Sequence, residues 1–327
     1  MPVSLYAWRE GDDEVTVRRE FALETFVADP RVNYWLRVEA PTPTEKEALV
    51  RVVGIDPLSM EDFEERNVRP KIEHYQTYDY LVFKTFSLVV KKKHEIHPAV
   101  RQVNLFYFSN IVVTLNHEKL PALDRVAAHF ENGSDFLLKH GPDYLVNAML
   151  DVVVDDYFPV VDEIDDAIED IEEDVEDDPR PELLETLNDY RRIVIQFRRI
   201  LRSEHDVLRA ILRGTYPFFT HQVMKHFRDV ADHVLSLIDL LEANREYVYG
   251  IRETYRSAID ARMNNIMKTL TIVSVVMLPL NLITGIYGMN FHYMPELAHP
   301  LGYPTTLLVM LFVAIALVSF FKKREWL

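Results

Sequence analysis

The hydrophobic and polar positions of the chain change their pattern twice. Up to residue 116, runs such as "NYWLRVEA", "YLVFKTFSLVV", "VRQVNLFYF" and "NIVVTLN" are rich in β-branched and aromatic residues. Such runs predict strands, and "PTEKEALVRVV" between them predicts a short helix. We therefore expect an α/β domain over residues 1–141.

From residue 142 to residue 268 the pattern predicts long helices, broken near "DDPRPE" and "RGTYPFF" by prolines. The last of these helices carries a seam in steps of three and four residues: Phe227, Val230, Val234, Leu237, Leu241, Asn244, Val248, Ile251, Tyr255 and Ala258. A heptad seam packs against other helices. These helices belong either to the same chain or to further copies of it.

Two runs without charged residues follow, over residues 269–291 and 297–321, with a neutral histidine in the second. Each is close to the roughly 20 residues that cross a bilayer core of about 30 Å. We expect a first span at 269–289, an external loop at 290–303, a second span at 304–321 and a basic tail at 322–327. Two buried core helices are the alternative interpretation.

The charges that flank the spans predict their orientation. Lys268 precedes the first span, and Lys322, Lys323 and Arg324 follow the second, while Glu296 is the one charged residue of the loop apart from any charge on its histidines. By the positive-inside rule, both termini are cytoplasmic. The N-terminal stretch lacks the apolar run of a secretory signal, so we expect residues 1–268 in the cytoplasm.

Composition narrows the function. The 52 acidic residues exceed the 36 basic ones and give a net charge of −16, which argues against nucleic acid and favours cations as partners. The absence of cysteine excludes thiolate sites and cysteine nucleophiles. The first 150 residues contain no nucleophile, metal or phosphate-loop pattern typical of an enzyme, and we expect no organic cofactor.

The seam steps continue into the first span with unusually small and polar residues: Asn264, Met267, Thr271, Ser274, Leu278, Asn281, Gly285 and Gly288. Such a stripe favours either close helix packing or the lining of a pore. One stripe cannot enclose a water path, so a pore needs several copies around an axis.

The segment "GIYGMNF", followed by "MPEL", "GYP", a second span and the basic end "KKREWL", resembles the CorA family of divalent-cation channels. The resemblance extends upstream through "NNIMKTLT", "RDVADH", "VVDDYF" and "RPKIE". It implies an α+β membrane protein: a cytoplasmic α/β domain, a long stalk helix and two C-terminal transmembrane helices, assembled as a homopentameric funnel in the lipid bilayer of the inner membrane. The cargo would be Mg²⁺, with Co²⁺ and Ni²⁺ as lesser substrates.

Mg²⁺ loses its water shell reluctantly, so neutral oxygens suit its path better than carboxylates. Neither span contains Asp or Glu. The resemblance implies a selectivity filter of Gly288, Met289 and Asn290, whose alternative interpretation is an ordinary helix C-cap. It also implies a pore and gate formed by Asn264, Met267, Leu270, Ser274, Leu278 and Asn281. The family usually has Thr where Asn281 stands.

Regulation by cytosolic Mg²⁺, which would close the channel, is also implied by the resemblance. Asp229, His233 and Asp151 match family positions near regulatory metal sites. The acidic run of residues 162–178, otherwise a solvated helical face, would act electrostatically on the basic ring of Lys322, Lys323 and Arg324. A partner carboxylate expected near Val89 is missing from "SLVVKKKHE".

Two other functions stay open. A zinc or cobalt transporter of the same superfamily shares the Gly-x-Asn segment, although "MPEL" favours the magnesium branch. A membrane-anchored sensor without transport would place its function in the α/β domain.

Overall fold

The structure is a computed structural model that describes residues 3–12, 14–92, 95–131, 136–290, 292–324 and 326. It divides the chain into two compact units. Unit 1 comprises residues 1–174 and 180–251, and unit 2 comprises residues 175–179 and 252–327.

A seven-stranded sheet forms the base of unit 1, in the order β2-β1-β3-β7-β6-β5-β4. Only the pair β3–β7 is parallel among the described neighbours. The strands are β1 (Val3–Arg9), β2 (Thr16–Arg19), β3 (Val32–Glu39), β4 (Lys71–His74), β5 (Tyr78–Lys92), β6 (Glu95–Phe108) and β7 (Ile111–Asn116). The four expected strand segments coincide with β3, β5, β6 and β7, whereas β1, β2 and β4 were not expected.

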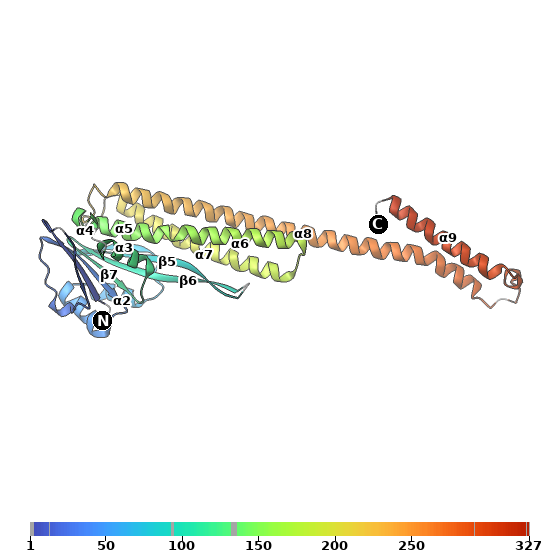
Figure 1. Cartoon of the computed structure of the whole chain (residues 1–327), viewed down its shortest axis with the longest axis horizontal. Helices are drawn as coiled ribbons and strands as arrows, with labels where there is room; N and C mark the ends of the chain where they lie inside the picture. The colour runs from blue at the N-terminus through green and yellow to red at the C-terminus, as the bar shows by residue number, and fades with distance from the viewer. Residues whose placement is uncertain are drawn as a thin grey trace. The chain divides into compact units, whose positions relative to one another are not determined.

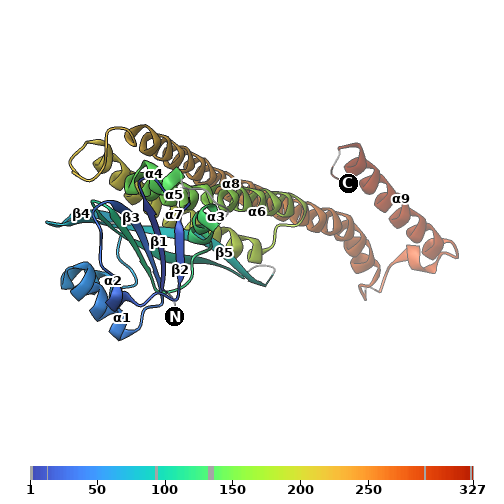
Figure 2. The same ribbon diagram turned by 60° about the vertical axis from the view of Figure 1, so that its left-hand side comes forward.

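Helices cover both faces of this sheet (Figures 1 and 2). Alternation along β3 explains how: Leu36 and Val38 pack with α1 (Pro43–Ala48), η2 (Leu49–Val53) and α2 (Pro57–Glu64). On the opposite face, Trp35 lies against Phe130 of α3 (Pro121–Glu131), with their rings tilted to each other, and donates a hydrogen bond to Thr114. A short turn, η1 (Leu23–Thr25), and helix α4 (Phe136–His140) complete the layers. The α/β domain expected from the sequence is therefore present.

Four long helices continue the chain: α5 (Pro142–Asp155), α6 (Tyr157–Asp177), α7 (Pro181–Leu212) and α8 (Met224–Tyr287). In unit 1, α6, α7 and the first part of α8 run side by side (Figures 1 and 2). The seam of α8 from Phe227 to Ile251 is buried at every position. This part of the seam packs within its own chain, because α6 and α7 cover it, and it does not by itself indicate assembly.

Unit 2 contains the rest of α8, the turn η3 (Pro295–Ala298) and helix α9 (Gly302–Lys323). Both apolar helices are long enough to cross a membrane. In the most apolar 18-residue stretch of each helix, only 6% of the residues are buried. Helices of a soluble core would bury these side chains. Exposed apolar surface on this scale requires a nonaqueous environment or a partner, which excludes the interpretation as buried core helices of a single chain.

Candidate cation path and regulatory site

The polar stripe of α8 lies on exposed surface in unit 2. Asn264, Ser274 and Asn281 are exposed, as are Met267 (54%), Leu270 (58%) and Leu278 (69%). No side chain of the described part of unit 2 packs over this stripe closely enough to bury these six residues. The face is therefore free to border an aqueous path or to meet other helices.

Within unit 2, the opposite face of α8 contacts the end of α6 and the turn between α6 and α7. Residues 176–179 of this turn border an open cavity of about 900 Å³ together with Ala258, Ala261, Arg262, Asn265, Ile266, Thr269, Leu270 and Val273 of α8. Arg262 Nη1 also pairs with Asp178 Oδ1 at 3.1 Å. At 3.6 residues per turn, the polar stripe is centred roughly 150° round the helix from this face. Leu270 lies at the border between the two faces.

Hydroxyl groups on the stripe are oriented by the helix itself. Thr271 donates to the carbonyl of Met267 at 2.7 Å, and Ser274 donates to the carbonyl of Leu270 at 2.8 Å. Because each proton is used inside the helix, the hydroxyl oxygen keeps its lone pairs for an outside donor. Such oxygens suit the water shell of a cation.

The end of α8 differs from a left-handed C-cap. Among the described residues, the glycines with positive φ are Gly11, Gly54, Gly141 and Gly214, so neither Gly285 nor Gly288 adopts that conformation. Instead, the N–H of Gly288 donates to Thr284 at 2.9 Å, and a Cβ on Gly288 would lie 3.1 Å from the same carbonyl oxygen. Gly288 thus avoids the crowding that a side chain would suffer against the Thr284 carbonyl oxygen. Met289 and Asn290 follow it and are exposed.

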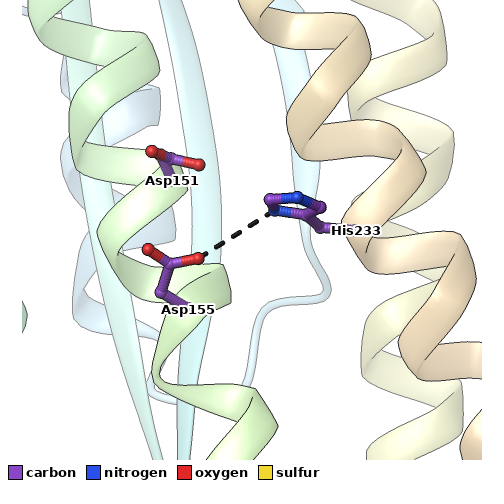
Figure 3. A group of neighbouring side chains, drawn as sticks. All are labelled: Asp151, Asp155 and His233. Carbon is purple, nitrogen blue, oxygen red and sulfur yellow. Dashed lines mark ion pairs between the residues drawn. The ribbon is translucent and has the colours of Figure 1, made fainter.

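A second group of candidate ligands lies in unit 1, between α5 and α8. Asp151, Asp155 and His233 each offer a ligand atom, and these atoms all lie within 4.8 Å of one another (Figure 3). Nδ1 of His233 is buried, has no hydrogen-bond partner among the described residues, and lies 4.0 Å from Oδ1 of Asp155. Two carboxylates and an imidazole converge here without satisfying one another.

The electrostatics of this group favour a cation. Partial burial, and then the nearby carboxylate of Asp155, raise the pKa of Asp151 above its ordinary value. Asp229 adds to the rise, although it lies outside the group of three. A cation between these carboxylates would relieve their repulsion. The three residues fit a divalent metal: carboxylates suit Mg²⁺, and the imidazole suits Co²⁺, Ni²⁺ or Zn²⁺.

Comparison with known proteins decides the family. The family model described as "CorA-like Mg2+ transporter protein" matches residues 31–323. The chain belongs to the CorA family. It is 35% identical to the cobalt/magnesium transport protein CorA of Thermotoga maritima over 84% of this chain and 77% of that protein. It is 32% identical to YfjQ of Bacillus subtilis, named as a metal ion transporter, over 90% of this chain and 89% of that protein.

The fold agrees with a solved CorA. The structure of the CorA magnesium transporter from Methanocaldococcus jannaschii superposes with a TM-score of 0.81 and covers 99% of this chain and 98% of its own, at 21% identity. Together with the two exposed apolar helices, CorA membership identifies a membrane protein that transports ions and is not an enzyme.

Asp155 was not predicted from the sequence as a candidate ligand. The signal was present, because Asp151 and Asp155 are four residues apart in α5, the same spacing as Asp229 and His233 in α8.

Val89, near which the resemblance to the CorA family predicts a carboxylate, is exposed in β5 and pairs with His97 of β6. The side chains of Lys91, Lys92 and Glu95 lie outside the described part, as do Lys93 and His94.

The charged segments of this CorA chain are placed as follows. In α6 the apolar side chains Val161, Ile164, Ile168, Ile171 and Val175 are buried, and most of the acids of residues 162–178 are exposed. Lys322, Lys323 and Arg324 are exposed at the end of α9. The side chain of Glu296 lies outside the described residues. The acidic run is therefore the solvated face of an amphipathic helix, and its electrostatic role stays a prediction.

Proposed function

We propose that the chain is one subunit of a homopentameric CorA channel that imports Mg²⁺, and also Co²⁺ and Ni²⁺, across the inner membrane. The observation that carries the proposal is the division of α8 into two faces. One face contacts the α6–α7 turn of its own chain, and the polar stripe lies on the other. Five such stripes around an axis would enclose a water path.

The stripe suits a hydrated cation. Asn281, Ser274 and Asn264 offer neutral oxygens, which can bind the ion's water without trapping the ion as a carboxylate would. Gly288, Met289 and Asn290 form the proposed filter, with Asn290 side-chain carbonyls accepting from the ion's water shell. Met267 and Leu270 form the proposed gate, where a ring of apolar side chains excludes water. Both termini are cytoplasmic, so the basic ring lies on the cytoplasmic side of the membrane and Glu296 of the loop lies on the external side.

The driving force needs no nucleotide. A divalent cation gains about 4.6 kcal/mol on crossing 100 mV towards the negative side. In the closed state, cytosolic Mg²⁺ would occupy the group formed by Asp151, Asp155 and His233, with Asp229 contributing charge. Since the side chains of these residues come from α5 and α8, a bound ion would tie the two helices together.

A zinc or cobalt transporter is the second candidate, and the imidazole of His233 favours it, because nitrogen ligands select these metals over Mg²⁺. Liposome flux separates the two. The full chain is reconstituted, an inside-negative potential is applied, and uptake of Mg²⁺ is measured in competition with Co²⁺, Ni²⁺ and Zn²⁺. Uptake of Mg²⁺ by a pentamer, with Zn²⁺ as the weaker competitor, supports the proposal. Uptake of Zn²⁺ without Mg²⁺ contradicts it, as does a chain that remains monomeric in mild detergent.

A further inference from the structure

A basic groove lies in unit 1, far along the chain from the candidate cation path. It is a cavity of about 470 Å³ between the segment before β4, strand β5 and helix α7. Arg69, Lys84, Arg192 and Arg199 line it, and no Asp or Glu among the described residues does. In a chain with 52 acidic and 36 basic residues, four cations without a carboxylate form an unusual local excess.

The groove is built from one face of α7. Arg192, Gln196, Arg199 and Ser203 are spaced by four, three and four residues, so they lie along one side of the helix. Arg69 and Asn67 stand across from them, in the segment that precedes β4. The donors therefore converge from two sides.

The positive charges of this groove are largely uncompensated. Within the described chain, no carboxylate lies at ion-pair distance from Arg69, Lys84 or Arg199. Arg192 pairs with Asp189 at 3.2 Å, but its side chain is 81% exposed, so the pair is weak. Arg69 and Arg199 thus keep their guanidinium N–H groups available for an anion.

Lys84 makes the groove more than a surface patch. This residue is only 7% exposed, and its Nζ donates to Asn67 Oδ1 at 3.2 Å. The carboxyl group of Glu204 lies behind it and accepts from the Lys84 backbone N–H at 3.0 Å. Burial raises the pKa of Glu204 to about 8 and lowers the pKa of Lys84 from its ordinary value, so at neutral pH the Glu204 carboxyl group is less ionised than an exposed one and offsets less of the positive charge.

We propose that this groove binds a soluble polyphosphate anion, such as a nucleoside triphosphate. Arginine forks match phosphate oxygens in pairs, and a chain of phosphates reaches several separated cations as a single carboxylate does not. The volume lies within the range of small-molecule sites. The site is independent of the proposed transport function, because none of its residues belongs to the candidate cation path or to the group around His233.

The test is a calorimetric titration of the full chain in phosphatidylcholine nanodiscs with inorganic triphosphate, and separately with ATP. A buffer free of divalent cations prevents the ligands from acting by chelation. Both ligands are expected to bind at moderate salt and more weakly at high salt, because screening weakens exposed charge pairs. Adenosine is expected not to bind. Failure of triphosphate to bind overturns the proposal, whatever ATP does.

The double variant Arg69→Gln with Arg199→Gln is expected to weaken triphosphate binding by at least about tenfold, because charge-assisted contacts are lost. Arg209→Gln is the matched control, since this exposed arginine lies on α7 about 9 Å beyond Ser203. It is expected to change affinity less than about twofold, a small effect on the usual affinity scale. Equal affinity in the double variant, with an unchanged unfolding temperature, overturns the proposal.

The lipid source of phosphate is tested by the same titration in nanodiscs of phosphatidylglycerol. A groove for a soluble anion gives the same affinity in both lipids. A lipid headgroup that already occupies the groove would weaken triphosphate binding in the anionic lipid alone, and that result overturns the assignment to a soluble ligand.

Discussion

Nδ1 of His233 lies 4.0 Å from Oδ1 of Asp155, at the point where α8 passes α5 in unit 1. This separation is too long for a hydrogen bond. It is short enough for both atoms to contact one ion, and Asp151 provides a third ligand atom within 4.8 Å of the others. The relationship joins residues 78 positions apart in the sequence, and it gives the proposed regulation a defined location.

Removing one ligand should therefore desensitise transport. We expect Asp155→Asn and His233→Ala to raise the metal concentration for half-maximal inhibition at least about tenfold, since even an outer partner of a metal ligand has an effect of this size. Initial flux into liposomes at low internal metal should stay unchanged. The measurement is flux against internal Mg²⁺ and, separately, Co²⁺.

Asp232→Asn is the control for these variants, because Asp232 is exposed beside His233 in sequence but does not belong to the group of three. Inhibition that is equally shifted by Asp232→Asn would mean that general charge, and not a bound ion, closes the channel. A larger shift for Co²⁺ than for Mg²⁺ in His233→Ala would identify the imidazole as a direct ligand.

Polar substitution at the proposed gate should open it. Met267→Asn is expected to raise Mg²⁺ flux under closing conditions about tenfold, equal to a barrier lowered by about 1.4 kcal/mol, because water enters a polar constriction more easily. Val273→Asn is the matched control, since Val273 is equally exposed at 54% but borders the cavity on the other face of α8. Equal leaks in both variants would show that Met267 does not form the gate.

Glu204 should make the stability of the chain depend on pH. Burial raises its folded pKa to about 8, from 4.5 in a free side chain. For an acid whose folded pKa is raised, the stabilisation is fully present below about pH 4.5 and is lost as pH rises towards 8. The slope from this one group is about 1.4 kcal/mol per pH unit within that window.

Glu204→Gln keeps the shape and removes the titration. We expect the unfolding temperature of this variant in detergent to change less between pH 5 and pH 8 than that of the original chain, with the variant the more stable of the two at pH 8. Tyr157 and the backbone of Lys84 would still hydrogen-bond the amide oxygen. Parallel pH profiles would show that Glu204 does not titrate in this range.

Much of the architecture could be predicted because local patterns decide it. The apolar runs give α8 and α9, and the strand runs give β5, β6 and β7. The strand β1 was not predicted, although its buried and half-buried positions pair with β3 across more than twenty residues of sequence. Pairing of that kind depends on a partner that no local window contains.

The heptad seam shows a second limit. A period of 3.5 residues identifies a buried face but not the chain that buries it. For Phe227 to Ile251 the structure assigns the covering helices to the same chain. The group formed by Asp151, Asp155 and His233 could not be predicted in full for a similar reason. The approach of Asp155 to α8 depends on how α5 and α8 pack and not on spacing within either helix.

Flux through Asn290→Ala tests whether the polar stripe that ends at Asn290 conducts a hydrated cation. Asn265→Ala is the control, because Asn265 is exposed on the opposite face of α8, beside the α6–α7 turn. The two variants and the original chain are reconstituted at equal density, and Mg²⁺ uptake is followed at a fixed inside-negative potential. We expect Asn290→Ala to lose at least about nine-tenths of the uptake, a barrier rise of about 1.4 kcal/mol, and Asn265→Ala to retain it. Uptake by Asn290→Ala as fast as that of the original chain would show that the cation does not pass a filter formed by Asn290.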